Sequence, residues 1–242
     1  MFEEAKAQLA PTGVLRAGIN MGNFLLVTGR TPDGDPDGCS PDMARAIAAK
    51  LGVPCKLVPY KTPGELGDAV GTNAWDIGLI GAEPQRAQKI AFSAAYVEIE
   101  ATYLVPAGSP IQSVAEVDRP GVRLVTTARS AYGLWLENNI KHATLVLAEG
   151  LDGSFNKFVA DKLEALAGLR PRLIEDVKKL PGARILDGQF AAVQQAVGTA
   201  KANTAAAAFL RDFVEEAKRS GFVKSLIEKH GTVGRLSVAP AA

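Results

Sequence analysis

The feature that most constrains this chain is the repeated alternation of short apolar runs with amphipathic segments. The runs "VLRAGI", "CKLVPY" and "WDIGLI" have the composition of strands and are separated by segments with helical periodicity. A second set, "VRLVTT", "TLVLA" and "EALAGL", follows in the same manner. Such alternation is typical of βα units that build a largely parallel sheet. The sequence therefore predicts an α/β protein with two lobes.

The helix signals support this interpretation. Residues 41–51 place Met43, Ile47 and Leu51 on one face, with Ser40 as the expected N-cap and Gly52 just past the end. A capping box at Thr62 to Glu65 starts a short helix. Further helices are predicted from Ser113, over 130–140, from Asp152, from Pro171 and over 203–220.

The last part of the chain has no strand set of its own. After the extended stretch "ARILDGQFAAVQQAV" it is helical, so we expect it to return to the first lobe. The predicted division is 1–101 for the first part of lobe 1, 102–187 for lobe 2 and 188–242 for the returning part. The two crossings, near 99–104 and 186–190, are not rich in Gly or Ser, which favours hinge strands over a flexible linker.

Composition excludes several classes of protein. The 27 Lys and Arg residues nearly balance the 26 Asp and Glu residues, and no basic block indicates a nucleic-acid partner. No apolar run approaches the roughly 18 residues of a spanning helix. The start "MFEEAKAQLAPTG" lacks the basic and apolar regions of a secretory signal, but a mature protein after signal removal would look the same. The composition does not settle the compartment, and a cytoplasmic location is left open.

Metal and cofactor signals are weak. The two cysteines, Cys39 and Cys55, flank a predicted helix that holds them farther apart than the roughly 7 Å a disulfide allows, so free thiols are expected. Only His142 and His230 are present, and no cluster has metal-ligand spacing. We expect neither a metal nor a cofactor.

Four segments together resemble one known family. "DGCSPDMARAIAAKLG", "WDIGLIGAEPQRAQKIAFSAAYVE", "GVRLVTTARSAYGLWL" and "LIEKHG" resemble, in this order, the family 3 bacterial solute-binding proteins, periplasmic proteins that feed ABC importers. The resemblance implies the type II periplasmic binding protein fold, in which two α/β lobes joined by two hinge strands close over one small ligand. It also implies a monomer whose partner is an ABC transporter permease.

The resemblance implies where a ligand carboxylate binds. Arg86 matches the arginine that clamps the carboxylate in this family, and a planar guanidinium offers two parallel donors for that task. Ser130, Ala131 and Tyr132 match the helix start whose backbone N–H groups complete the site. The alternatives are a first-turn arginine paired with Glu83 or solvent, and a plain N-cap at Ser130.

Two positions depart from the family pattern. The aspartate that pairs with a ligand ammonium is replaced by Leu169 and Arg170, and Glu83 stands where Ser or Thr is usual. Glutamate is a poor N-cap, so Glu83 is expected to have another task. Either Glu83 supplies the lost anionic contact, or Arg86, Arg170 and Arg129 favour a carboxylate without an amine.

The remaining candidates follow the first and third strands. In "GINMGNFLL", Asn20 and Asn23 are expected polar contacts, and Phe24 is either a wall of the pocket or a core residue. Gly81, at the end of the third strand, completes the candidate ligand-binding set.

An enzymatic function is the alternative to binding. The chain has no G-x-S-x-G elbow, P-loop or dinucleotide fingerprint. Some members of the superfamily are small-molecule dehydratases, and Glu83 could serve as the general acid of such a site. The sequence favours a solute-binding component of an ABC importer that takes a small carboxylate-bearing ligand, an amino acid or a related organic acid.

Overall fold

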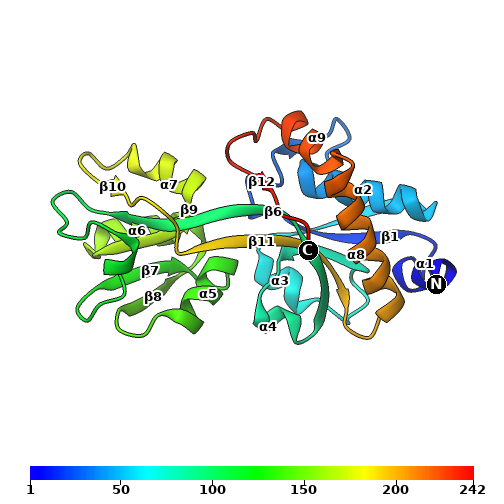
Figure 1. Ribbon diagram of the computed structural model, residues 1–242, viewed down its shortest axis with the longest axis horizontal. Helices are drawn as coiled ribbons and strands as arrows, with labels where there is room; N and C mark the ends of the chain where they lie inside the picture. The colour runs from blue at the N-terminus through cyan, green and yellow to red at the C-terminus, as the bar shows by residue number, and fades with distance from the viewer. The chain divides into compact units, whose positions relative to one another are not determined.

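The computed structural model describes residues 1–242 and divides the chain into two compact units (Figure 1). The first unit combines Met1–Glu98 with Gln194–Ala242, and the second unit contains Ile99–Val193. The chain passes from one unit to the other within strand β6 (Ile90–Val105) and again within strand β11 (Ala191–Ala200). Both crossings are therefore made by strands.

The other strands of the first unit are short, and all but two of them belong to one sheet. They are β1 (Leu15–Asn20), β2 (Gly29–Arg30), β3 (Pro36–Asp37), β4 (Cys55–Tyr60), β5 (Ile77–Gly81) and β12 (Ser237–Val238). Its helices are α1 (Phe2–Leu9), α2 (Cys39–Leu51), α3 (Pro63–Asp68), α4 (Pro84–Ala87), α8 (Thr204–Arg219) and α9 (Phe222–Lys229). The strands predicted from "VLRAGI", "CKLVPY" and "WDIGLI" are confirmed as β1, β4 and β5.

The second unit has strands and helices of its own. Its strands are β7 (Arg123–Thr127), β8 (Thr144–Ala148), β9 (Ala165–Leu169) and β10 (Arg184–Ile185). Its helices are α5 (Ala131–Asn139), α6 (Gly150–Ala160) and α7 (Arg170–Val177), with a 3₁₀ turn at Val114–Glu116. The three strands predicted for this half are confirmed as β7, β8 and β9.

The sheet of the first unit has the order β4-β1-β5-β11-β6. Strands β4, β1 and β5 are parallel, whereas β11 runs antiparallel to β5, with Val197 opposite Leu79. Parallel strands end at the same edge of a sheet, so Asn20 of β1 and Gly81 of β5 lie at one edge. In open α/β sheets this carboxyl edge is where ligands usually bind.

The same ten-stranded sheet continues through the second unit in the order β6-β9-β7-β8 and repeats this arrangement. Strand β7 is parallel to both β8 and β9, with Val125 opposite Val146 and Leu166. Strands β7 and β9 therefore end at the same edge, and the segments that contain Ser130 and Arg170 follow directly from it.

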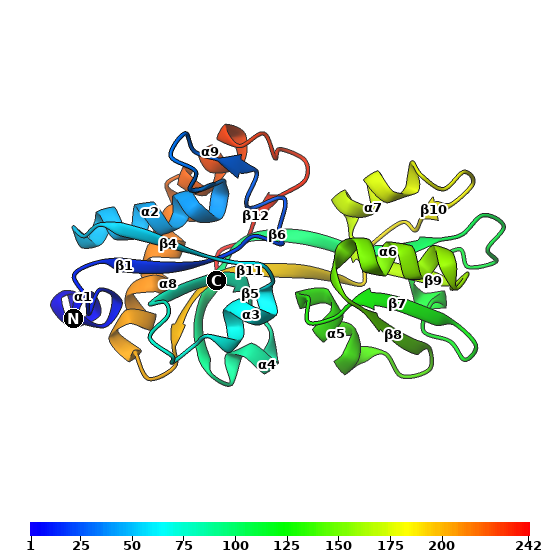
Figure 2. The same ribbon diagram turned by 180° about the vertical axis from the view of Figure 1, so that it is seen from behind.

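Helices α2 and α3 pack on opposite faces of the first sheet (Figures 1 and 2). Met43, Ile47 and Leu51 of α2 are buried, as the periodicity predicts. Leu66 of α3 approaches the backbone of β5 so closely that a Cβ atom at Gly78 would lie 2.8 Å from it. Glycine in this strand therefore allows the helix to seat against the sheet.

The predicted N-cap of α2 is wrong. The helix begins at Cys39, with Gly38 as its N-cap, and the Ser40 hydroxyl donates a hydrogen bond to the carbonyl of Leu26. Gly38 has φ +149°, and a Cβ atom there would lie 2.2 Å from the Leu26 oxygen. Close packing against that carbonyl thus requires glycine at the N-cap position. The helix therefore begins two residues earlier than predicted, at Cys39 instead of residue 41. The αL glycine at the other end, Gly52, is as expected.

Several element boundaries also differ from the prediction. Helix α6 begins at Gly150, before Asp152, and α7 begins at Arg170, before Pro171. The stretch expected to be extended from residue 183 consists of two strands, β10 and β11, with an irregular connection between them. Helix α1 was not predicted at all.

The C-terminal helices pack within the first unit. Helix α8 contacts α1, where the rings of Phe2 and Phe209 meet edge to face with centroids 5.9 Å apart. Helix α9 contacts α2. The end of the chain therefore covers elements formed by its beginning.

Candidate functional site

Arg86 lies in the short helix α4, just after the carboxyl end of β5. Its side chain turns back toward the strand, and its Nη1 donates a hydrogen bond of 2.8 Å to the carbonyl of Gly81. Only 9% of the residue is exposed. A surface arginine in bulk solvent is therefore excluded, and the guanidinium is held at the edge where the parallel strands end.

Glu83 occupies the N-cap position of the same helix without capping it. The side chain makes no cap hydrogen bond, as expected for a residue with another task. Only 8% of the residue is exposed. Burial, opposed by the charge of Arg86, raises the pKa of Glu83 to about 7.

This raised pKa predicts a pH-dependent stability difference between Glu83→Gln and the unmodified protein. Since the pKa rises from 4.5 to about 7 on folding, the folded state is progressively disfavoured as the pH rises between these values. Glutamine does not titrate. The melting temperature of the variant minus that of the unmodified protein should therefore increase as the pH rises from 4.5 to 7. Above pH 7 this difference should stay constant. Thermal denaturation across this range measures it, and a gap independent of pH would contradict the assignment.

Asn20 is the last residue of β1, and Asn23 and Phe24 lie in the turn that follows. The side-chain oxygen of Asn20 accepts a 3.0 Å hydrogen bond from the N–H of Gly22, and that of Asn23 accepts from Leu25. Both side chains are more than nine-tenths buried. Their oxygens stabilise the turn, and each amide nitrogen offers two donors that a ligand could accept. Phe24 is half-buried, which fits a wall position.

Most candidate binding residues of the second unit lie at the start of α5. Ser130 is confirmed as the N-cap: its Oγ accepts a 3.0 Å hydrogen bond from the N–H of Gly133 and donates to the carbonyl of Thr127. The N–H groups of Ala131 and Tyr132 are left without intrahelical partners at the positive end of the helix. Arg129, just before the cap, has φ +59°, which bends the chain sharply into this helix.

A hydroxyl network missed by the sequence analysis supports this helix start. The Tyr132 hydroxyl donates to Oγ1 of Thr127 at 2.9 Å, and Thr127 Oγ1 is 2.8 Å from Oγ of Ser154. All three residues are buried. Burial raises the pKa of Tyr132, which keeps its phenol protonated. Tyr132 thus uses its side chain to hold the loop and has only its backbone to offer a ligand.

Arg170, the first residue of α7, is already paired. Its Nε donates a 2.6 Å hydrogen bond to Glu100, and its Nη2 donates to the carbonyl of Gly188. The charge of Arg170 is therefore compensated within the second unit. This pairing weakens the idea that Arg170 adds an unbalanced positive charge to a binding site.

Cys39 and Cys55 are free thiols, as predicted. Burial raises the pKa of each to about 11, so both are protonated at neutral pH. A protonated, buried thiol is a poor nucleophile and a poor metal ligand. Neither cysteine contributes to the candidate site.

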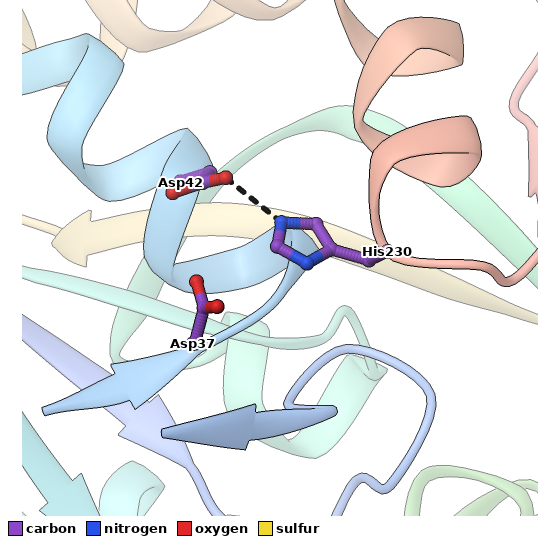
Figure 3. A group of neighbouring side chains, drawn as sticks. All are labelled: Asp37, Asp42 and His230. Atoms are coloured by element: carbon purple, nitrogen blue, oxygen red, sulfur yellow. Dashed lines mark hydrogen bonds and ion pairs between the residues drawn. The ribbon is translucent and has the colours of Figure 1, made fainter. Parts of the chain in front are cut away.

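Asp37, Asp42 and His230 form a polar cluster that no local motif indicated (Figure 3). Their ligand atoms all lie within 4.8 Å of one another, a spacing that could hold a metal ion. The Asp42 carboxylate, however, already accepts hydrogen bonds from Lys229 at 2.7 Å and His230 at 2.8 Å, and Arg45 bonds its other oxygen. Burial opposes ionisation of Asp42, but these donors outweigh it and hold its pKa low. The cluster therefore ties α9 to α2.

The structure thus brings the candidates together in two groups. In the first unit, Gly81, Glu83 and Arg86 lie at and just after the end of β5, and Asn20 and Phe24 lie at and just after the end of the neighbouring β1. The other group, in the second unit, comprises Arg129, Ser130, Ala131, Tyr132 and Arg170. Each group follows the carboxyl ends of parallel strands in its own unit.

Two α/β units linked through two strands define the two-lobe, type II class of periplasmic binding folds. Residues 19–233 match the family model of the bacterial extracellular solute-binding proteins, family 3. The chain belongs to this family. None of its helices combines the length and hydrophobicity that a transmembrane segment requires.

Solved structures confirm the fold. A mutant of ArgBP from T. maritima is 20% identical with a TM-score of 0.72, covering 94% of this chain and 99% of that one. An amino-acid ABC transporter substrate-binding protein, AbpA from Streptococcus pneumoniae, bound to L-arginine, is 19% identical with a TM-score of 0.71, covering 92% and 96%.

One curated relative is an enzyme. Cyclohexadienyl dehydratase of Pseudomonas aeruginosa is 24% identical over 170 residues, which are 65% of this chain and 63% of the relative. The match thus spans less than two thirds of the length of that protein. An ancestral amino-acid-binding protein described as a precursor of cyclohexadienyl dehydratase is 21% identical with a TM-score of 0.71, covering 93% and 98%.

Proposed function

We propose that this protein is the solute-binding component of an ABC importer and takes a small carboxylate-bearing ligand, an amino acid or a related organic acid, between its two lobes. The observation that carries the proposal is the buried guanidinium of Arg86 at the carboxyl edge of the first sheet. Within a family of extracellular solute-binding proteins, such a group is suited to a carboxylate, because it offers parallel donors in a fixed plane.

The second unit would complete the carboxylate site from its helix start. The N–H groups of Ala131 and Tyr132 point outward from the N-terminal turn of α5, and the cap at Ser130 fixes their direction. Asn20, Asn23, Phe24 and Gly81 would line the first lobe, and Arg129 and Arg170 the second. Closure of the lobes would remove water from these contacts and strengthen them. The protein would act as a periplasmic monomer that a transporter permease recognises.

A screen by thermal shift tests this proposal. Amino acids, dicarboxylates and aromatic acids would each be added to the protein, and a ligand at a hundred times its dissociation constant should add about 2.7 kcal/mol to the free energy of unfolding. At least one compound with a carboxylate is expected to raise the melting temperature, and its amide or ester should not. A screen in which only compounds without a carboxylate bind would contradict the proposal.

The second candidate function is a small-molecule dehydratase. The similarity to cyclohexadienyl dehydratase favours it, and the carboxyl group of Glu83, with its pKa of about 7, has the protonation behaviour of a general acid. The two functions differ in the fate of the ligand. Incubation of each ligand with the protein, followed by proton NMR, should return it unchanged if the protein only binds it.

A further inference from the structure

The second unit holds a pocket at the end opposite to its candidate binding residues. The cavity has a volume of about 350 Å³, within the range of roughly 300 to 1,000 Å³ for small-molecule sites. It is lined by the end of α6 and the turn after it, by residues that follow β6 and by the segment between α7 and β10. These segments adjoin the amino end of β9, because the end of β6 is paired there, with Leu104 opposite Leu166. Ser130 and Arg170 follow the carboxyl ends of β7 and β9, so the pocket is separate from the proposed ligand site.

The lining of this pocket is apolar and closely packed. Phe158 and Leu163, each 3% exposed, line the pocket and belong to a hydrophobic core cluster of the unit. On another side, a Cβ atom at Gly182 would lie 2.9 Å from the Cβ of Ala107, so the two turns that carry these residues are in close contact. Val159, in contrast, lines the pocket and is 43% exposed. The fold thus leaves apolar surface open to solvent in a hollow with fixed walls, and an apolar group that enters it is removed from water.

Lys162 is the one charged residue of the lining. It has φ +50°, a left-handed conformation that is costly for a residue with a Cβ atom, and it follows the end of α6, where glycine is the usual residue. Its N–H donates a 3.3 Å hydrogen bond to the carbonyl of Val159, and its own carbonyl accepts one from Arg123. The N–H of Leu163 donates to the carbonyl of Phe158 at 3.1 Å. Because these backbone bonds already satisfy carbonyls of the last turn, the ammonium of Lys162 is not needed to cap the helix.

The ammonium of Lys162 is also without an acidic partner. The two acids beside it in the sequence are paired with other cations, Asp161 with Lys157 and Glu164 with Arg123, each at 2.7 Å. Lys162 itself takes part in none of the salt bridges of the chain. An anion that enters the pocket therefore meets an unpaired positive charge, whereas a cation is repelled.

We propose that this pocket is a second binding site, for a medium-chain fatty acid, whose alkyl chain contacts the apolar lining and whose carboxylate pairs with Lys162. A single ammonium balances one negative charge, which favours a carboxylate over a doubly charged phosphate group. The volume is near the lower end of the range for small-molecule sites, which favours a chain of medium length over a long lipid tail. The site uses no residue of the proposed function, so its failure leaves that function intact.

Calorimetric titration of the unmodified protein with octanoate tests the proposal. Octanol has the same chain without the charge, and octyltrimethylammonium carries the opposite charge. Octanoate is expected to bind about threefold more tightly than octanol, as an exposed ion pair provides, and the cation should bind more weakly than octanol. The proposal is overturned if octanoate does not bind, or if octanol or the cation binds as tightly as octanoate.

Two variants assign the binding of octanoate to this pocket. Val159→Glu places a carboxylate in the lining and should weaken octanoate about tenfold or more, whereas Ile174→Glu, at a residue of similar exposure outside the lining, should not. Lys162→Gly removes the ammonium and relieves the left-handed conformation, so it should abolish the preference for octanoate over octanol without lowering the melting temperature. If Val159→Glu binds octanoate as the unmodified protein does, octanoate occupies another site and the proposal fails. It fails equally if Lys162→Gly keeps the full preference.

Discussion

Replacing Arg86 with alanine is expected to weaken binding of the ligand found by the thermal-shift screen by about 1.5 to 3 kcal/mol or more. This is the range for hydrogen bonds to a charged group, and it corresponds to one to two orders of magnitude in the dissociation constant. The physical reason is that a ligand carboxylate loses the planar pair of donors that only a guanidinium provides. Calorimetric titration of the variant and the unmodified protein measures the effect.

The conservative variant Arg86→Lys is the matched control. Lysine keeps the positive charge but offers a point donor, so it should recover only part of the lost affinity. Because Arg86 also satisfies the carbonyl of Gly81, the melting temperature of each variant must be measured without ligand. Affinity unchanged in Arg86→Ala would show that the carboxylate binds elsewhere, whatever happens to the stability.

Gly133→Ala is expected to destabilise the second unit by about 2 to 4 kcal/mol, combining overpacking with loss of a helix cap. A Cβ atom at this position would lie 2.4 Å from the carbonyl oxygen of Thr127 and 2.8 Å from Oγ of Ser130. The loop and the first turn of α5 would have to separate. The hydrogen bond from the Gly133 N–H to Ser130 would then be lost, together with the orientation of the N–H groups beside it.

A second glycine of the same unit is the control. Gly153 lies within α6, and a Cβ atom there would meet nothing within 4 Å. Gly153→Ala should therefore stabilise the protein by about 0.5 to 1 kcal/mol, because alanine is the better helix former. Chemical denaturation followed by circular dichroism compares the two variants. Equal effects of the two substitutions would refute the packing argument for Gly133.

Local signals in the sequence predicted much of the fold. The strands β4 and β8 match their predicted limits, the buried face of α2 follows from its period, and the caps at Thr62 and Ser130 form the expected hydrogen bonds. These features depend on residues within about one turn of each other. The prediction at Ser40 failed for the opposite reason, since the start of that helix is decided by contact of Gly38 with Leu26.

By itself, then, the sequence determined which segments become strands and helices and that Arg86 and Ser130 follow the ends of strands. Only the tertiary structure decided which charges are paired: Arg170 with Glu100 across 70 positions, and His230 with Asp42 across 188. It also decided that Glu83 is buried beside the charge of Arg86. The reason is physical. Periodicity and capping act between neighbours in the chain, whereas the partners of a buried charge are brought to it by the packing of elements that are distant in the sequence.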